Sequence, residues 1–139
     1  MVINRRLPQH TNFADIWHAS GMAWLVSDAR VLASAEVSPD RASRRRGLLK
    51  RDSLDGAFVI DRCRWIHTIG MHFPIDAAYL DTDDIVIKTI QMNRYRIGIP
   101  VWRARSVIEA EAGAFARWGL RVGDKVELRD DESGEASTG

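Results

Sequence analysis

Short apolar runs separated by polar turns recur along the chain, and their alternation predicts β-strands. The pattern is clearest between Ser106 and Gly113, where the apolar Ile108 and Ala110 alternate with Glu109 and Glu111. The other runs are MAWLV, VLASAEV, GAFVI, AAYLD, DIVIKTIQM and the closing GLRVGDKVEL. Together these runs predict about seven short strands.

Polar turn residues join neighbouring runs and predict two hairpins. SDAR separates MAWLV from VLASAEV, and a group of aspartates separates AAYLD from DIVIKTIQM. Aspartate tolerates left-handed turn conformations. Short strands joined by tight turns are typical of a curled antiparallel sheet. We therefore expect a mostly β (α+β) fold, a compact antiparallel β-barrel-like domain with two or three short helices.

Helical features occur in three segments. Residues 11–20 place apolar side chains on one face at helical spacing. The stretch SPDRASRRRGLLKRD begins with Ser38, a plausible N-cap, and with Pro39, which suits the first helical position. Residues 114–118 are expected to form a third, short helix.

The chain is expected to hold one domain. Its 139 residues fit a single core. Residues 1–21 form an N-terminal extension, residues 22–129 the barrel-like domain, and residues 130–139 an acidic tail. That tail lacks large apolar residues, so we expect it to be disordered.

Composition indicates a cytoplasmic protein. The single cysteine, Cys63, cannot form an internal disulfide and fits a reducing compartment. Apolar runs are far shorter than the roughly 20 residues of a membrane helix, and the N-terminus has no signal-peptide core. We expect no membrane partner. The net charge of +1 combines a basic body with the acidic tail.

The stretch WIHTIGMHFPID, residues 65–76, carries the densest candidate chemistry. Cys63, His67, His72 and Asp76 are all possible metal ligands, and Cys63 with His67 is a possible thiol–base pair. These residues support a metal- or thiol-dependent hydrolase as an alternative function. Pro74 opposes a helix, however, and an extended strand would turn His72 away from His67. We therefore predict no metal, no cofactor and no catalytic residue.

A structural role is the favoured interpretation of each residue in this stretch. His67 and Thr68 can satisfy backbone groups, and Asp76 can accept backbone N–H bonds and anchor the turn into AAYLD. A polar ligand pocket formed by His67, Thr68 and Asp76 is the remaining possibility.

Two basic stretches raise the question of nucleic-acid binding. The first contains six bases within eleven residues: Arg41, Arg44, Arg45, Arg46, Lys50 and Arg51. A solvated charged face is favoured there, with weak nucleic-acid or anion binding as the alternative. The second, MNRYRIGIPVWRARS, interleaves arginines with Tyr95 and Trp102. It suits a single-stranded nucleic acid or a sugar, but we favour a loop whose aromatic side chains pack on the barrel rim.

Three motifs in order resemble one family. They are RRRGLLKRDSL, IHTIGMHFPIDAAYLDTDDIV and VIEAEAGAFARWGLRVGDKV, and the resemblance spans roughly residues 30–128. This pattern is similar to the domain-of-unknown-function 192 family of small bacterial and archaeal proteins. The resemblance implies a barrel-like, mostly β fold and no established activity. It also implies that Arg44 and Arg51 form a structural pair, with Asp76 or Glu109 as ion-pair partners.

The chain departs from the family in its central motif. Many relatives have Met-Lys-Asn-Thr before the Pro-x-Asp step, where this chain has Thr-Ile-Gly-Met. Our leading hypothesis is a binding or interaction module with an unknown small-molecule or protein partner. The expected ligand-facing residues are His67, Thr68, Asp76, Arg44 and Arg51.

Overall fold

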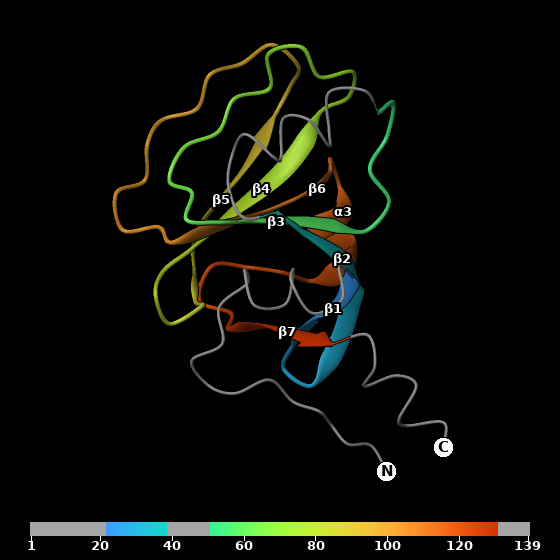
Figure 1. Cartoon of the computed structure of the whole chain (residues 1–139), viewed down its shortest axis with the longest axis vertical. Coiled ribbons are helices and arrows are strands. Elements are labelled where there is room, and N and C mark those ends of the chain that lie inside the picture. The colour runs from blue at the N-terminus through green and yellow to red at the C-terminus, as the bar shows by residue number, and fades with distance from the viewer. Residues whose placement is uncertain (1–21, 39–50, 131–139) are drawn as a thin grey trace.

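Seven β-strands and one short helix make up the described part of the chain, residues 22–38 and 51–130 of a computed structural model (Figure 1). The strands are β1 (Met22–Ser27), β2 (Arg30–Ser38), β3 (Ala57–Asp61), β4 (Ile75–Leu80), β5 (Val86–Met92), β6 (Ser106–Glu111) and β7 (Val126–Asp130). The helix is α3 (Ala114–Trp118). The predicted mostly β fold is confirmed.

Parts of the sequence-based interpretation lie outside these residues. The helix predicted over residues 11–20, most of the helix predicted after Ser38, and the acidic tail cannot be compared with the structure. Ser38 itself is the last residue of β2, where the sequence predicted a helix N-cap. The described residues contain no helix that is long and apolar enough to cross a membrane.

All strands lie in one sheet with the order β5-β4-β6-β3-β2-β1-β7. Both predicted hairpins are present, β1–β2 and β4–β5. The turn of the second hairpin is held by Asp81, whose Oδ1 accepts hydrogen bonds from the N–H groups of Asp83 and Ile85 at 2.9 and 3.0 Å. The sheet departs from the antiparallel prediction at one place, because β2 and β3 are parallel.

The sheet curls until its two edge strands meet. Ile85, before β5, forms an isolated antiparallel bridge with Lys125, before β7. The N–H of Val86 donates to the carbonyl of Asp124 at 2.9 Å, and the N–H of Val126 donates to the carbonyl of Asp84 at 3.0 Å. This seam closes one end of the sheet and produces a half-barrel.

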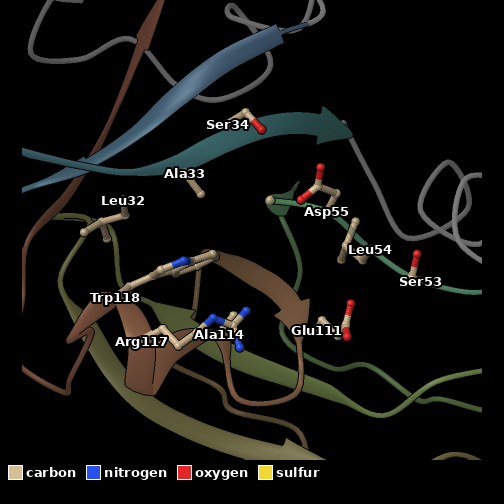
Figure 2. Close-up of a pocket in the computed structure, with 11 residues that line it drawn as sticks. Leu32, Ala33, Ser34, Ser53, Leu54, Asp55, Glu111, Ala114, Arg117 and Trp118 are labelled. Atoms are coloured by element: carbon tan, nitrogen blue, oxygen red, sulfur yellow. The ribbon is translucent and has the colours of Figure 1, made fainter.

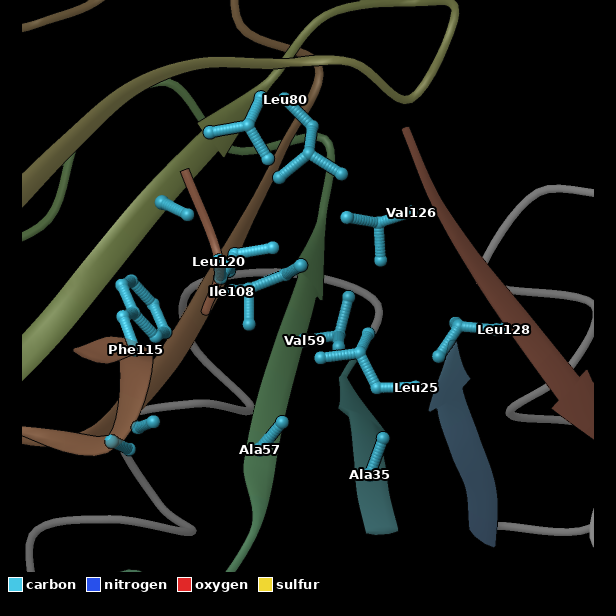
Figure 3. Packing of buried hydrophobic residues seen from close by; sticks show 14 of the residues in the cluster. Leu25, Ala35, Ala57, Val59, Leu80, Ile108, Phe115, Leu120, Val126 and Leu128 are labelled. Atoms are coloured by element: carbon cyan, nitrogen blue, oxygen red, sulfur yellow. The ribbon is translucent and has the colours of Figure 1, made fainter. Parts of the chain in front are cut away.

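An inner core fills the curl, and every strand contributes to it (Figure 3). On β3, Ala57 and Val59 point into this inner core, while Phe58 and Ile60 point to an outer core on the other side of the sheet. Burial on both faces explains why β3 and β4 carry almost continuous apolar runs, and why β6 is buried up to Ala110 although it contains Glu109. The outer core needs a cover, and two long connections supply it.

Candidate functional site

The stretch WIHTIGMHFPID forms part of that cover. Its first half runs beside the β5–β6 connection as an irregular antiparallel ribbon, which we define as residues 64–68 and 95–101. The N–H groups of Gly98 and Val101 donate to the carbonyls of Ile66 and Arg64 at 3.0 and 2.8 Å, and His67 forms a bridge with Ile97. The segment is therefore neither a helix nor a regular strand.

Thr68 joins the two halves of the ribbon. Its side chain is fully buried, its hydroxyl donates to the carbonyl of Asn93 at 2.6 Å, and the same oxygen accepts from the N–H of Arg96 at 2.8 Å. The backbone N–H of Thr68 also donates to the carbonyl of Arg96 at 2.8 Å. Because these contacts use the hydroxyl as donor and as acceptor, Thr68 has a structural role.

Asp76 lies on β4 and is only 6% exposed. Its Oδ2 accepts from the N–H groups of Gly113 and Phe115 at 3.0 and 3.1 Å, and its Oδ1 accepts from the Gln91 side-chain amide at 3.1 Å. Gly113 provides no side-chain cap for α3, so Asp76 supplies the missing acceptor from a distant strand. Asp76 does accept backbone N–H bonds, but it anchors the start of α3 rather than the turn into β4.

The possible metal ligands do not converge. The described residues contain no group of three or more His, Cys, Asp or Glu side chains that could hold a metal ion. The buried thiol of Cys63 donates to the carbonyl of Trp65 at 3.2 Å, and Nδ1 of His67 accepts from the N–H of Ile69 at 3.2 Å. His72 is exposed, with its Nδ1 3.1 Å from Asp52.

Arg51 pairs with a different carboxylate from those implied by the family resemblance. Its two terminal nitrogens donate to the two carboxylate oxygens of Glu36 at 2.8 and 2.9 Å, and neither Asp76 nor Glu109 takes that place. This bidentate pair lowers the pKa of Glu36 and raises that of Arg51, chiefly through the hydrogen bonds. Arg44 and the rest of the first basic stretch lie outside the described residues.

A pocket of about 590 Å³ lies beside α3, which we call the α3 pocket (Figure 2). One wall comes from β2 and the segment before β3, and the opposite wall from the end of β6 and from α3. Its lining residues are Leu32, Ala33, Ser34, Ser53, Leu54, Asp55, Gly56, Glu111, Ala114, Arg117 and Trp118.

Gly56 allows the segment before β3 to lie close to β2 in the first wall of the pocket. It has a φ of 84°, and a Cβ at this position would lie 2.6 Å from the carbonyl oxygen of Ser34. Only glycine permits both the left-handed conformation and this close approach. The sequence places a Gly before the β3 run, which is a signal for a special backbone position, but it does not reveal the pocket.

The charged side chains of the α3 pocket have no partner among the described residues. Asp55, Glu111 and Arg117 form no ion pair or hydrogen bond through their side chains there. Trp118 packs on Phe115 with ring centroids 5.7 Å apart, and with Leu32 it borders the inner core. The site thus offers an apolar surface beside exposed acidic and basic side chains that a ligand could contact.

None of the sequence-predicted ligand residues that the structure describes lines this pocket. A second pocket, of about 470 Å³, lies closer to the predicted stretch and is lined by Arg62, Cys63, Arg64, Trp65, Ala104 and Arg105. We call it the arginine pocket. Sequence reasoning named Cys63 and Trp65, which line the arginine pocket, but it identified neither pocket, because each joins segments that are distant along the chain.

Comparisons with known proteins agree with this fold. The family model DUF192, described as Uncharacterized ACR, matches residues 23–128. A protein of unknown function from Novosphingobium aromaticivorans superposes with a TM-score of 0.64 at 20% identity, over 76% of this chain and 83% of that one. A candidate transcription regulator from Sinorhizobium meliloti superposes with a TM-score of 0.63 at 20% identity, over 77% and 92%. No curated protein matches the chain significantly.

Proposed function

Because the chain belongs to the uncharacterised DUF192 family, we propose its function from its own geometry: it is a binding module for a small molecule that carries a positively charged group. The observation that carries this proposal is the α3 pocket, whose ionisable side chains lack partners among the described residues. At about 590 Å³ the pocket is within the usual size range of small-molecule sites.

The charges of the lining select the ligand. Asp55 and Glu111 together outweigh Arg117 by one negative charge. An amine would therefore be attracted to the two carboxylates, and a ligand carboxylate, where present, would find Arg117. The Trp118 ring and Leu32 would contact the hydrocarbon part of such a ligand.

This proposal places the ligand away from the residues that the sequence analysis named. Thr68, Asp76 and Arg51 make hydrogen bonds that hold the fold, so a ligand would have to displace those bonds. For the buried Thr68 and Asp76 that displacement would leave polar groups unsatisfied, at a cost of about 1–3 kcal/mol for each group. The partly exposed pair of Arg51 and Glu36 would lose less. A ligand could enter the α3 pocket without breaking hydrogen bonds of this kind.

The test is a titration of ¹⁵N-labelled protein with alkyl diamines, zwitterionic amino acids and neutral sugars, followed by NMR. We expect the amines or amino acids to shift the indole N–H signal of Trp118, which Trp118→Phe would identify among the five tryptophans. Glu111→Gln should weaken this binding by up to about five-fold, because it removes one ion pair and Glu111 is exposed to solvent.

Glu127→Gln is the matched control, since it removes one carboxylate from β7 outside the pocket. It should leave the affinity unchanged. If sugars bind as well as amines do, or if Glu111→Gln and Glu127→Gln behave alike, the charge-based proposal is wrong.

A further inference from the structure

The ribbon that covers the outer core has an inner and an outer face. Ile66 and Thr68 are fully buried against the core, so the residues between and beside them point outward. His67 and Ile97 are directly opposed, which places their side chains on the same outer face. The rings of Trp65 and His67 lie 5.5 Å apart and extend this face.

Exposed apolar side chains concentrate on and beside this outer face. Among the described residues, five of the eight large exposed hydrophobic side chains lie in the ribbon or next to it: Ile69, Tyr95, Ile97, Ile99 and Trp102. Ile97, Ile99 and Trp102 are 66%, 72% and 73% exposed. They belong to the run IGIPVW, whose backbone projects at the margin of the molecule beside residues 62–74 (Figure 1). Exposed apolar residues clustered in this way mark an interaction surface.

The same two connections are strongly basic. Residues 62–75 and 93–105 contain no aspartate or glutamate, but they contain Arg62, Arg64, Arg94, Arg96, Arg103 and Arg105. Asp61, at the end of β3, lies 4.0 Å from Arg62 and 3.5 Å from Arg105. The other four guanidinium groups have no carboxylate partner among the described residues. The surface is thus complementary to an anion.

The run IGIPVW stands between two arginine pairs, in RYR before it and RAR after it. We propose that this loop docks the protein onto an anionic lipid bilayer, with the isoleucines and Trp102 entering the headgroup boundary and the flanking arginines contacting lipid phosphates. Tryptophan and tyrosine favour the membrane interface, and basic residues near it gain from the negative surface potential. The arginine pocket, which borders the ribbon at Arg64 and Trp65, is placed to receive one phosphate.

A lipid surface fits these residues better than a nucleic acid does. Nucleic-acid sites combine arginines with aromatic rings on which bases stack, and Tyr95 and Trp102 could serve either partner. The exposed Ile97 and Ile99 between them offer no ring to a base but suit the apolar part of a bilayer. The sequence predicted no membrane partner because its apolar runs are too short for a spanning helix. A docking loop needs only a short apolar run.

Vesicles provide the test, with the full chain and the tryptophan fluorescence as readout. Phosphatidylcholine vesicles containing phosphatidylglycerol should bind the protein in co-sedimentation and shift the Trp102 emission to shorter wavelength. Phosphatidylcholine alone should bind it weakly, and added salt should weaken the binding to mixed vesicles. Arg94→Gln with Arg103→Gln should lower the affinity about thirty-fold, at roughly 1 kcal/mol per arginine.

Two exposed residues in the turn before β7 serve as controls. Arg121→Gln removes a charge and Val122→Ala removes apolar surface, and neither should affect vesicle binding. Ile97→Ala with Ile99→Ala should weaken binding to mixed vesicles without lowering the melting temperature, since both side chains are exposed.

Three results would overturn the proposal. The first is that the protein binds both kinds of vesicle equally well, or binds neither. The second is tight, salt-sensitive binding of oligothymidylate that is lost in Tyr95→Ala and Trp102→Ala without any vesicle binding. The third is binding of soluble glycerol phosphate that equals vesicle binding and is unaffected by the isoleucine changes. The α3 pocket shares no residue with this surface, so the two proposals stand or fall separately.

Discussion

Asp76 shows how much one buried carboxylate holds in place. It accepts two backbone N–H groups at the start of α3 and one side-chain amide from β5. Asp76→Ala would leave the N–H groups of Gly113 and Phe115 without their acceptor, so we expect it to lower the free energy of unfolding by about 3 kcal/mol. Gln91→Ala removes only the third contact and should cost about 1 kcal/mol or less. Urea unfolding at pH 7 measures both, and equal losses would contradict this role for Asp76.

Asp84, in the turn before β5, makes stability depend on pH. Burial raises its pKa from the ordinary 3.8 to about 6, against the opposing charges of Lys125 and Arg105. The folded state therefore holds this proton more tightly than the unfolded chain does, and stability should fall as pH rises from about 4 to 6. This destabilisation is complete above that window.

Asp84→Asn should remove the loss of stability that ionised Asp84 causes at neutral pH. The residue has a φ of 62°, a conformation that asparagine tolerates. Because the group is half-buried and partly screened by solvent, we expect a gain of only about 1 kcal/mol at pH 7 and none at pH 3. Denaturant titrations across this range would measure the difference, and an equal gain at both pH values would exclude the titration as its cause.

At the scale of elements, the ribbon depends on Thr68. Thr68→Val keeps the shape of the side chain but removes the bonds to the Asn93 carbonyl and the Arg96 N–H, at an expected cost of about 2 kcal/mol. Amide hydrogen exchange should then accelerate in residues 64–68 and 95–101 more than in β3 or β6. The exposed Thr89 on β5 offers the control, and Thr89→Val should change neither region. Uniform acceleration over the whole sheet would show that the ribbon is not a separate unit.

The strands were predictable because each carries its own local signal. Alternation in β6 and the aspartate turn between β4 and β5 are readable from neighbouring residues, and both were confirmed. The parallel pairing of β2 with β3 was not predicted, because the antiparallel expectation came from the tight turns elsewhere in the chain. The long connection between β2 and β3, which parallel strands need, was not used to predict strand direction. The candidate sites were harder to predict from the sequence than the strands. The α3 pocket joins residues 32–34, 53–56 and 111–118, so no local motif announces it.

For the whole molecule, the two cores share one sheet and should therefore unfold together. Ile60 and Ile108 are both fully buried, the first in the outer core and the second in the inner core. Their strands, β3 and β6, are paired along their length, with Val59 opposite Ile108 and Ile60 opposite Val107. Losing either core removes one side of the same two strands, so neither core can remain folded without the other.

Ile60→Ala and Ile108→Ala test this coupling with the same chemical change on opposite faces. Each should cost about 2–5 kcal/mol, which is the usual range for a buried isoleucine. Urea unfolding of each variant should be followed by tryptophan fluorescence and by far-ultraviolet circular dichroism. Within each variant, the two probes should give the same midpoint. If the two probes gave different midpoints in Ile60→Ala but not in Ile108→Ala, the outer core and its ribbon would unfold independently. In that case the surface that they present could loosen without loss of the half-barrel.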